Sequence, residues 1–163
     1  MLIRAEKLGD AEAIHDITAM AFAPKAFSDG TEAALPAALN ADGDMVLSLV
    51  AVDTEIVGHV AFSTVTFDGR DMGWIGLGPV AVHPDRQLQG IGSALITQGL
   101  DQIKALGAKG CVLVGDPKYY HRFGFVGDGA LRYQDLPVEL VQWVSFDGSA
   151  PKGILGFAPA FGD

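Results

Sequence analysis

The segment 74–107 constrains the fold more than any other part of the chain. It begins as an apolar, strand-like run, WIGLGPVAV, which Gly78 and Pro79 interrupt near its middle. Because proline cannot donate a ladder hydrogen bond and glycine packs poorly, this pair predicts a bulge that separates the strand from a neighbour. A sheet that splays at this point leaves backbone groups free to pair with a long, amide-bearing ligand.

The turn HPDRQLQ follows this strand, and a helix opens at Gly90, with a second glycine at Gly92. The first N–H groups of a helix have no intrahelical partner and the dipole is positive there, so a helix start binds anions. Glycine lets the backbone approach a bulky phosphate because it has no Cβ. The spacing lacks the third glycine of a dinucleotide fingerprint and the Gly-Lys-Ser/Thr of a P-loop. By itself, the pattern is compatible with a phosphate-binding loop or with an ordinary turn.

Short periodic segments on both sides of this motif complete an α/β pattern. The expected strands cover 1–7, 45–52, 55–67, 74–82, 110–115, about 140–146 and 153–157, with a hairpin turn at 53–55 and a buried, parallel and central strand at 110–115. The first expected helix runs from Asp10, its N-cap, to Phe22, and a second covers about 31–40. A third runs from Gly90 to Gly107, with a buried stripe of Ile91, Leu95, Ile103 and Leu106. The segment DPKYYHRFGF is expected to make a helical turn.

This order predicts a single-domain α/β/α fold over residues 1–163, with a core of about 1–145 and a C-terminal strand region, 146–163. The central sheet should be mixed, with one splayed strand pair, and helices should cover both faces, since both faces of the run 55–67 are largely apolar.

Length and composition exclude several classes of protein. A chain of 163 residues with 49% hydrophobic and 19% charged residues is expected to form one compact domain. No apolar run approaches the roughly 20 residues that cross a membrane, and MLIRAEKLGD lacks a signal-peptide core, so a cytoplasmic location is expected. The single cysteine, Cys111, excludes an internal disulfide and a thiolate metal cluster, and no metal is expected.

The charge distribution carries more information than the net charge of −9, which argues against nucleic-acid binding. Residues 1–60 contain ten acids and three bases, whereas residues 101–122 contain four bases and two acids. A locally basic segment in an acidic protein favours an anionic ligand on that side, although ordinary surface scatter would give the same count.

The run GPVAVHPDRQLQGIGSALI resembles the strand and the Q/R-x-x-G-x-G/A motif of the GNAT superfamily of acetyl-CoA-dependent N-acetyltransferases. YYHRFGF is similar to the later motif of this superfamily, in which a tyrosine stands four residues before the glycine of Gly-Phe. LSLVAV, IVGHVAFS and GFAPAF look like one largely uncharacterised bacterial branch, so the resemblance covers nearly the whole chain. It implies that acetyl-CoA is the co-substrate and that the acetyl group passes to a primary amine.

By this resemblance, strand 74–82 and the loop after it would hold coenzyme A. Val80 and Val82 would pair through their main chains with the pantetheine amides. The pyrophosphate would be bound by Gln87, Leu88, Gln89, Gly90, Ile91, Gly92 and Ser93, mostly through backbone N–H groups. Arg86 and Arg122 could reach the 3′-phosphate, or could be solvated surface residues.

The same resemblance places the general acid at Tyr120, and Tyr119 is expected to pack its helix against the sheet. Free thiols have a pKa near 8.5 and tyrosine near 10, so a hydrogen bond to the departing thiolate would matter more than full proton transfer. The general base is less defined, because MGWIGLGPVAV lacks the glutamate that some relatives carry there. His59 could relay a proton through water, although a histidine on an apolar strand is more often a core residue. Cys111, in a buried strand, is expected to act as a small hydrophobe and not as an acyl carrier.

These observations predict an N-acetyltransferase acting on a small-molecule amine. In the family fold the acidic first 60 residues border the acceptor, which favours a cationic amine. Two alternatives stay open: a CoA- or acyl-CoA-binding module without turnover, which the missing strand carboxylate favours, and a protein N-acetyltransferase. No nucleic-acid or membrane partner is expected, and the chain could be a monomer or a homodimer.

Overall fold

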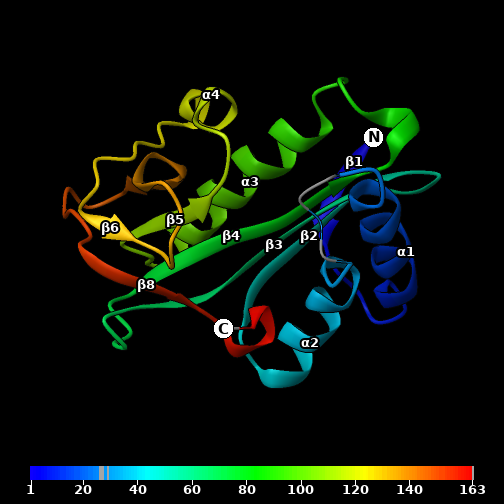
Figure 1. The fold of residues 1–163 in the computed structure, drawn as a ribbon. Coiled ribbons are helices and arrows are strands. Elements are labelled where there is room, and N and C mark those ends of the chain that lie inside the picture. Colours follow the sequence, from blue (N-terminus) through cyan, green and yellow to red (C-terminus); the bar gives the residue numbers. More distant parts are fainter. Residues whose placement is uncertain (26–27, 29, 163) are drawn as a thin grey trace.

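The computed structural model describes residues 1–25, 28 and 30–162 (Figure 1). The elements follow in the order β1 (Leu2–Ala5), α1 (Ala11–Phe22), α2 (Leu35–Asp42), β2 (Met45–Asp53), β3 (Glu55–Phe67), β4 (Trp74–Val82), α3 (Ile91–Ala105), β5 (Gly110–Val114), α4 (Pro117–Tyr120), β6 (Leu131–Arg132), β7 (Val141–Ser145) and β8 (Gly153–Phe157). Short 3₁₀ helices lie at Glu32–Ala34, Pro84–Arg86, His121–Phe123, Val138–Leu140 and Pro159–Phe161. None of the helices in the described part of the chain has the length and apolar character needed to span a membrane.

The sheet is mixed, as the sequence predicted. Its main path runs β1-β2-β3-β4-β5-β7, and along this path only the β4–β5 pair is parallel among the described strands. The long strand β3 extends past this path and pairs at its far end with β8, which also pairs with β6.

Helices cover both faces of the sheet, which confirms the layered prediction (Figure 1). On β3, Val60 and Phe62 face α3 and form the main core with its apolar stripe. Ala61 points the other way and packs against Leu39 of α2, while Ala81 of β4 packs against Ile17 of α1. The alternation of one strand's side chains between two helical layers explains why run 55–67 is apolar on both faces.

Strands β4 and β5 separate at the Gly78-Pro79 pair. They are paired only from Trp74 to Gly76, opposite 110–112. The register between β3 and β4 shifts at the same place, where β4 holds one residue more than β3, so a bulge lies there. Beyond this bulge, β4 has β3 on one side and no strand of the described chain on the other. The predicted bulge and splayed pair are therefore both confirmed.

The start of α1 differs from its prediction. Asp10 precedes the helix, but its carboxylate does not cap it. The carboxylate accepts hydrogen bonds at 2.7 Å from the Lys7 backbone N–H and from the Arg4 guanidinium. The nearby cation and amide therefore outcompete the helix for this carboxylate.

Two further expectations need correction, and one strand was missed. Leu106 is 68% exposed, because α3 ends at Ala105 and the chain turns at Gly107, whose φ is 95°. Strand β5 is parallel to β4 and buried, as expected, but it lies near one end of the sheet and is not central. Strand β6 was not predicted, because two residues are too few to show a period.

Candidate active site

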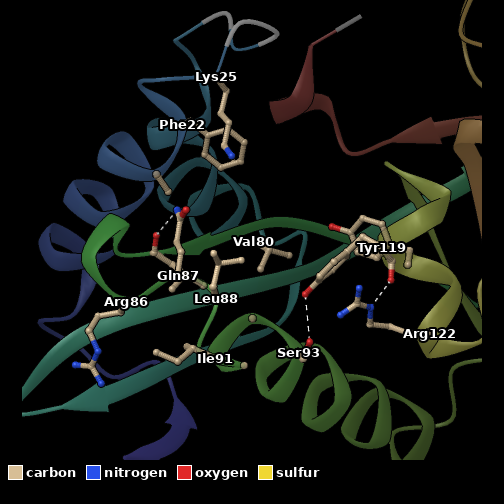
Figure 2. Close-up of a pocket in the computed structure, with 15 residues that line it drawn as sticks. Phe22, Lys25, Val80, Arg86, Gln87, Leu88, Ile91, Ser93, Tyr119 and Arg122 are labelled. Atoms are coloured by element: carbon tan, nitrogen blue, oxygen red, sulfur yellow. Dashed lines mark hydrogen bonds between the residues drawn. The ribbon is translucent and has the colours of Figure 1, made fainter.

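A cavity of about 510 Å³ lies beside the unpaired part of β4 (Figure 2). The strand, the loop after it, the first turn of α3, helix α4 and the end of α1 form its walls. Most residues predicted to form the site line it: Val80, Val82, Arg86, Gln87, Leu88, Gly90, Ile91, Gly92, Ser93, Tyr120 and Arg122. Lys25 adds a third cation to the two arginines, and none of the described lining residues is acidic. The cavity thus suits a ligand with several negative charges.

The strand wall turns backbone groups that do not pair with β3 toward the cavity. The His83 N–H donates to the carbonyl of Val57 on β3 at 2.8 Å. Near the end of β4, the backbone groups of the odd-numbered residues therefore point toward β3. Because successive residues of a strand point their N–H and C=O groups in opposite directions, those of Val80 and Val82 face the open edge. The Gln87 side chain confirms this direction, since its Nε2 donates to the Val82 carbonyl at 3.2 Å from the loop.

The loop between β4 and α3 turns sharply before the helix begins. Leu88 and Gly90 both adopt left-handed backbone conformations, with φ of 64° and 83°. The first helical hydrogen bond of α3 runs from Ala94 to Gly90, so the N–H groups of residues 91–93 have no backbone partner among the described residues. These donors point out of the helix start, where an anion would bind.

The glycine at position 92 keeps the space between β4 and α4 open. A Cβ at this position would lie 3.4 Å from the Tyr119 hydroxyl and 3.6 Å from a methyl group of Val82. Ser93, the next residue, has its hydroxyl 3.4 Å from the same Tyr119 oxygen (Figure 2). A larger side chain at position 92 would therefore project into the space between the strand and the two hydroxyls.

The two arginines differ in their surroundings. The Arg86 guanidinium forms an ion pair with Asp53 at 2.9 Å and donates from Nε to Gln89, and it points away from Tyr119 in Figure 2. Arg122 donates from Nε to the Tyr119 carbonyl at 2.8 Å, and its guanidinium stacks 4.4 Å from the centre of the Tyr119 ring. The terminal nitrogens of Arg122 have no acceptor among the described residues, so this arginine is the better placed of the two to bind a phosphate.

Two predicted residues do not line the cavity. Gln89 turns its side chain toward Arg86. His59 is 0% exposed, its Nε2 lies 2.8 Å from the Ser48 hydroxyl, and burial lowers its pKa to about 4. The structure therefore does not bring His59 into direct contact with a ligand in the cavity.

Tyr120 is held by close packing at the turn after β5. Its ring meets those of Tyr119 and Phe125, and a Cβ at Gly115 would lie 2.5 Å from it, so only glycine fits there. Burial, followed by the proximity of Tyr119 and Cys111, raises the pKa of Tyr120 to about 12. The phenol therefore keeps its proton at neutral pH and can act as a hydrogen-bond donor. Cys111 is fully buried and burial raises the pKa of its thiol, which fits its expected role as a small hydrophobe.

Four residues that line the cavity were missed. Ala21 and Phe22 end α1 and Lys25 follows it, about 60 residues before the loop between β4 and α3, and no local pattern marks them. Tyr119 was expected only to pack its helix; it does contact the main core, but it also lines the cavity.

Comparison with known proteins gives the family. The model of the acetyltransferase (GNAT) family matches residues 11–125, which include the strand, the loop and both tyrosines. The chain belongs to the GNAT family of acetyltransferases. The resemblance read from its motifs is confirmed.

Several members of the GNAT family are similar to this chain over most of its length. The uncharacterized N-acetyltransferase YhbS of Escherichia coli strain K12 is 40% identical over 127 residues, which are 77% of this chain and 73% of YhbS. A GNAT family acetyltransferase from Brucella melitensis, solved in complex with acetyl-CoA, is 42% identical with a TM-score of 0.88, over 98% of this chain and 97% of that one. The structure of E. coli YhbS in complex with CoA has a TM-score of 0.90 at 32% identity, over 99% and 92% of the two chains.

Proposed function

We propose that this GNAT acetyltransferase transfers the acetyl group of acetyl-CoA to a primary amine of a small molecule. The observation that carries the proposal is the open edge of β4, whose Val80 and Val82 backbone groups face a cavity that ends at the start of α3. The complexes of the Brucella relative with acetyl-CoA and of YhbS with CoA support this choice of co-substrate.

Each part of coenzyme A has proposed partners in this chain. The amides of pantetheine would pair with Val80 and Val82 as a neighbouring strand would. The pyrophosphate would accept hydrogen bonds from the N–H groups of residues 88–92 and from Ser93, with Gln87 bracing the loop. Arg122 would bind the 3′-phosphate, and Arg86, ion-paired to Asp53, would contribute at longer range.

In the transfer step the amine nitrogen forms a bond to the thioester carbonyl carbon and the carbon–sulfur bond breaks. The departing sulfur carries the electron pair of the broken bond. Tyr120, still protonated at neutral pH, would donate a hydrogen bond to it. At neutral pH a lysine-like acceptor is an ammonium, which must lose one proton before its nitrogen attacks; the nitrogen loses a second proton as the amide forms, and the departing thiolate can take up that one. No described lining residue is acidic, so the cavity wall offers no carboxylate for the first proton.

The acceptor is proposed to be cationic. Residues 1–60 carry ten acids against three bases, while the cavity is lined by Lys25, Arg86 and Arg122. By the family resemblance residues 1–60 border the acceptor, and a negative surface there would concentrate amines and repel carboxylates. A polyamine or an aminoglycoside has the charge that this arrangement favours.

A CoA-binding module without turnover is the second candidate, because β4 carries no carboxylate beside the cavity. An acetyl-CoA turnover screen separates the two. Free thiol release would be measured with primary amines, polyamines, aminoglycosides, acidic amino acids and peptides. Tight CoA binding without thiol release for any amine would favour the module, and turnover with peptides alone would favour a protein acetyltransferase.

The cofactor assignment has its own variant. Gly92→Val places a branched side chain beside the Tyr119 hydroxyl and Val82, in the space assigned to the pyrophosphate. We expect CoA binding to be lost while the circular dichroism spectrum and cooperative unfolding stay close to those of the wild type. Unchanged CoA affinity by calorimetry in folded Gly92→Val protein would refute the assignment.

A further inference from the structure

One buried glutamine lies next to the turn that leads to Tyr120. Gln142 is on β7 and is 1% exposed. Its Nε2 donates to the Gly115 carbonyl at 2.9 Å and lies 3.5 Å from the Leu140 carbonyl. Carbonyl oxygens only accept hydrogen bonds, so the amide nitrogen faces both of them and the amide oxygen points the other way. These contacts therefore fix the orientation of the Gln142 side chain.

The amide of Gln142 is not explained by packing. Its Oε1 is buried and has no partner among the described residues, which destabilises the folded state. In the β5–β7 register Gln142 stands opposite Leu113 of the main core. Side chains directly opposite each other share a face of the sheet, so packing favours an apolar residue at this position. The role of the amide therefore lies in the group that its nitrogen holds.

That group is the carbonyl that follows β5. The Gly115 carbonyl accepts its one described hydrogen bond from Gln142, while the Gly115 N–H donates to the Leu140 carbonyl at 3.0 Å. The peptide unit is planar, so holding this carbonyl fixes the plane that joins Gly115 to Asp116. The Asp116 carbonyl in turn accepts the Tyr120 N–H at 3.1 Å. Gln142 thus sets the direction in which the chain enters α4.

Gly115 also packs directly under the Tyr120 ring. A Cβ at position 115 would lie 2.5 Å from Cε2 and 2.9 Å from Cδ2 of Tyr120, so the ring fills the space that a side chain there would need. The other ring neighbours of Tyr120 include Tyr119 and Phe125. Because Tyr120 lines the cavity, a shift of the Gly115 backbone would reach the site through this contact.

We propose that Gln142 is a positioning residue for Tyr120, which holds the turn at Gly115 so that the phenol meets the departing sulfur in the right geometry. The inference rests on the role of Tyr120 in the proposed function. Gln142 does not line the cavity, so it acts through Gly115 and not by contact with a ligand. The position of a donor decides how well it stabilises a developing charge, and a misplacement of about 1 Å can cost up to about 10²-fold in rate.

The test removes the amide and keeps its length. Gln142→Met has an unbranched side chain without a donor. It leaves the Gly115 carbonyl without a partner but also removes the unpaired Oε1, so the two effects on stability have opposite signs. The midpoint of urea unfolding should therefore stay close to that of the wild type. Gln142→Glu keeps the length and, because burial favours the protonated carboxyl, one donor toward Gly115.

The matched control is a buried hydrogen bond away from Tyr120. The Thr18 hydroxyl of α1 is buried, donates to the Ile14 carbonyl at 2.7 Å and does not line the cavity. Thr18→Val removes this donor and keeps the shape of the side chain. It reports what the loss of a buried bond to a carbonyl does to the enzyme when Tyr120 is not involved.

The kinetic comparison uses acetyl-CoA and the most active amine of the screen. We expect kcat of Gln142→Met to fall about tenfold, because a displaced phenol is a smaller loss than a missing one. KM for acetyl-CoA, and the CoA dissociation constant from calorimetry, should stay within about threefold of the wild type, as should kcat of Gln142→Glu and of Thr18→Val. In the Tyr120→Phe background Gln142→Met should lower kcat by less than about twofold, because the hydroxyl that it positions is already gone.

A spectroscopic measurement gives a readout that does not need turnover. The chain has three tyrosines, Tyr119, Tyr120 and Tyr133. With isotope label in the tyrosine rings, the nuclear magnetic resonance signal of Tyr120 should move in Gln142→Met. The signal of Tyr133, which packs against Phe157 in a separate cluster, should not.

Four results would overturn the positioning role and leave the transferase intact. They are wild-type kcat in folded Gln142→Met, an equal loss from Gln142→Met with and without the Tyr120 hydroxyl, a loss in Gln142→Glu as large as in Gln142→Met, and an unmoved Tyr120 signal. Wild-type kcat in Tyr120→Phe would instead refute the role of Tyr120, and this inference with it. A wild type that binds CoA but acetylates no amine would refute the proposed function itself.

Discussion

Replacing Tyr120 with phenylalanine tests the chemistry of the site most directly. The substitution removes one hydroxyl and keeps the ring that packs against Tyr119, Phe125 and Gly115. The fold and CoA affinity should therefore survive. What is lost is the one donor that we assign to the departing sulfur.

The raised pKa of Tyr120 sets the size of the effect. With a pKa of about 12 against about 8.5 for a thiol, full proton transfer from Tyr120 to the thiolate would be uphill by about 5 kcal/mol, at 1.36 kcal/mol per pKa unit. Tyr120 should then act by hydrogen bonding to the developing charge. Removing one such donor costs about 3–4 kcal/mol, so kcat should fall by about 10²–10³-fold.

The adjacent tyrosine provides the control. Tyr119→Phe also removes one hydroxyl from the cavity wall, but that oxygen lies 3.4 Å from Ser93 and near the phosphate loop. We expect this change to weaken CoA binding modestly and to leave kcat within a few-fold of the wild type. Thiol release under saturating acetyl-CoA gives kcat, and calorimetry gives the CoA dissociation constant. Wild-type kcat in Tyr120→Phe, or an equal loss of kcat in both variants, would refute the role of Tyr120.

Three further predictions concern stability and the acceptor. In urea unfolding, Gly99→Ala should lower the free energy of unfolding by about 1–2 kcal/mol, because the added Cβ would overlap the buried Phe62 ring and this outweighs the helix preference of alanine. The control Thr97→Ala, on the exposed side of α3, should not destabilise the protein. Burial lowers the pKa of His59 from 6.5 to about 4, so the unfolded chain binds this proton more readily than the folded one. The free energy of unfolding should therefore fall by up to about 3 kcal/mol between about pH 6.5 and pH 4. An equally steep fall in His59→Gln would contradict this. A polyamine should have a higher kcat/KM than glutamate, and salt should reduce that value; preference for glutamate, or indifference to salt, would refute a cationic acceptor.

Local patterns in the sequence determined most of the fold. The apolar run 55–67, the hairpin turn at 53–55 and the glycine helix start each depend on residues close together in the chain. Gly78-Pro79 predicted the splayed strands, because a missing donor and a missing side chain act on the strand that contains them. The same local chemistry carries the family resemblance, since its two motifs are each a few residues long.

Only the tertiary structure decided which distant residues share the site. Phe22 and Lys25 reach the cavity because α1 packs against β4, and Arg86 is ion-paired because the β2–β3 turn brings Asp53 beside it. The sequence identified His59, but the pairing of β2 with β3 is what places the Ser48 hydroxyl 2.8 Å from its Nε2. Such contacts join segments 11 or more residues apart, and no local propensity encodes them. They follow from the register of the strands and from the way the helices pack on the sheet.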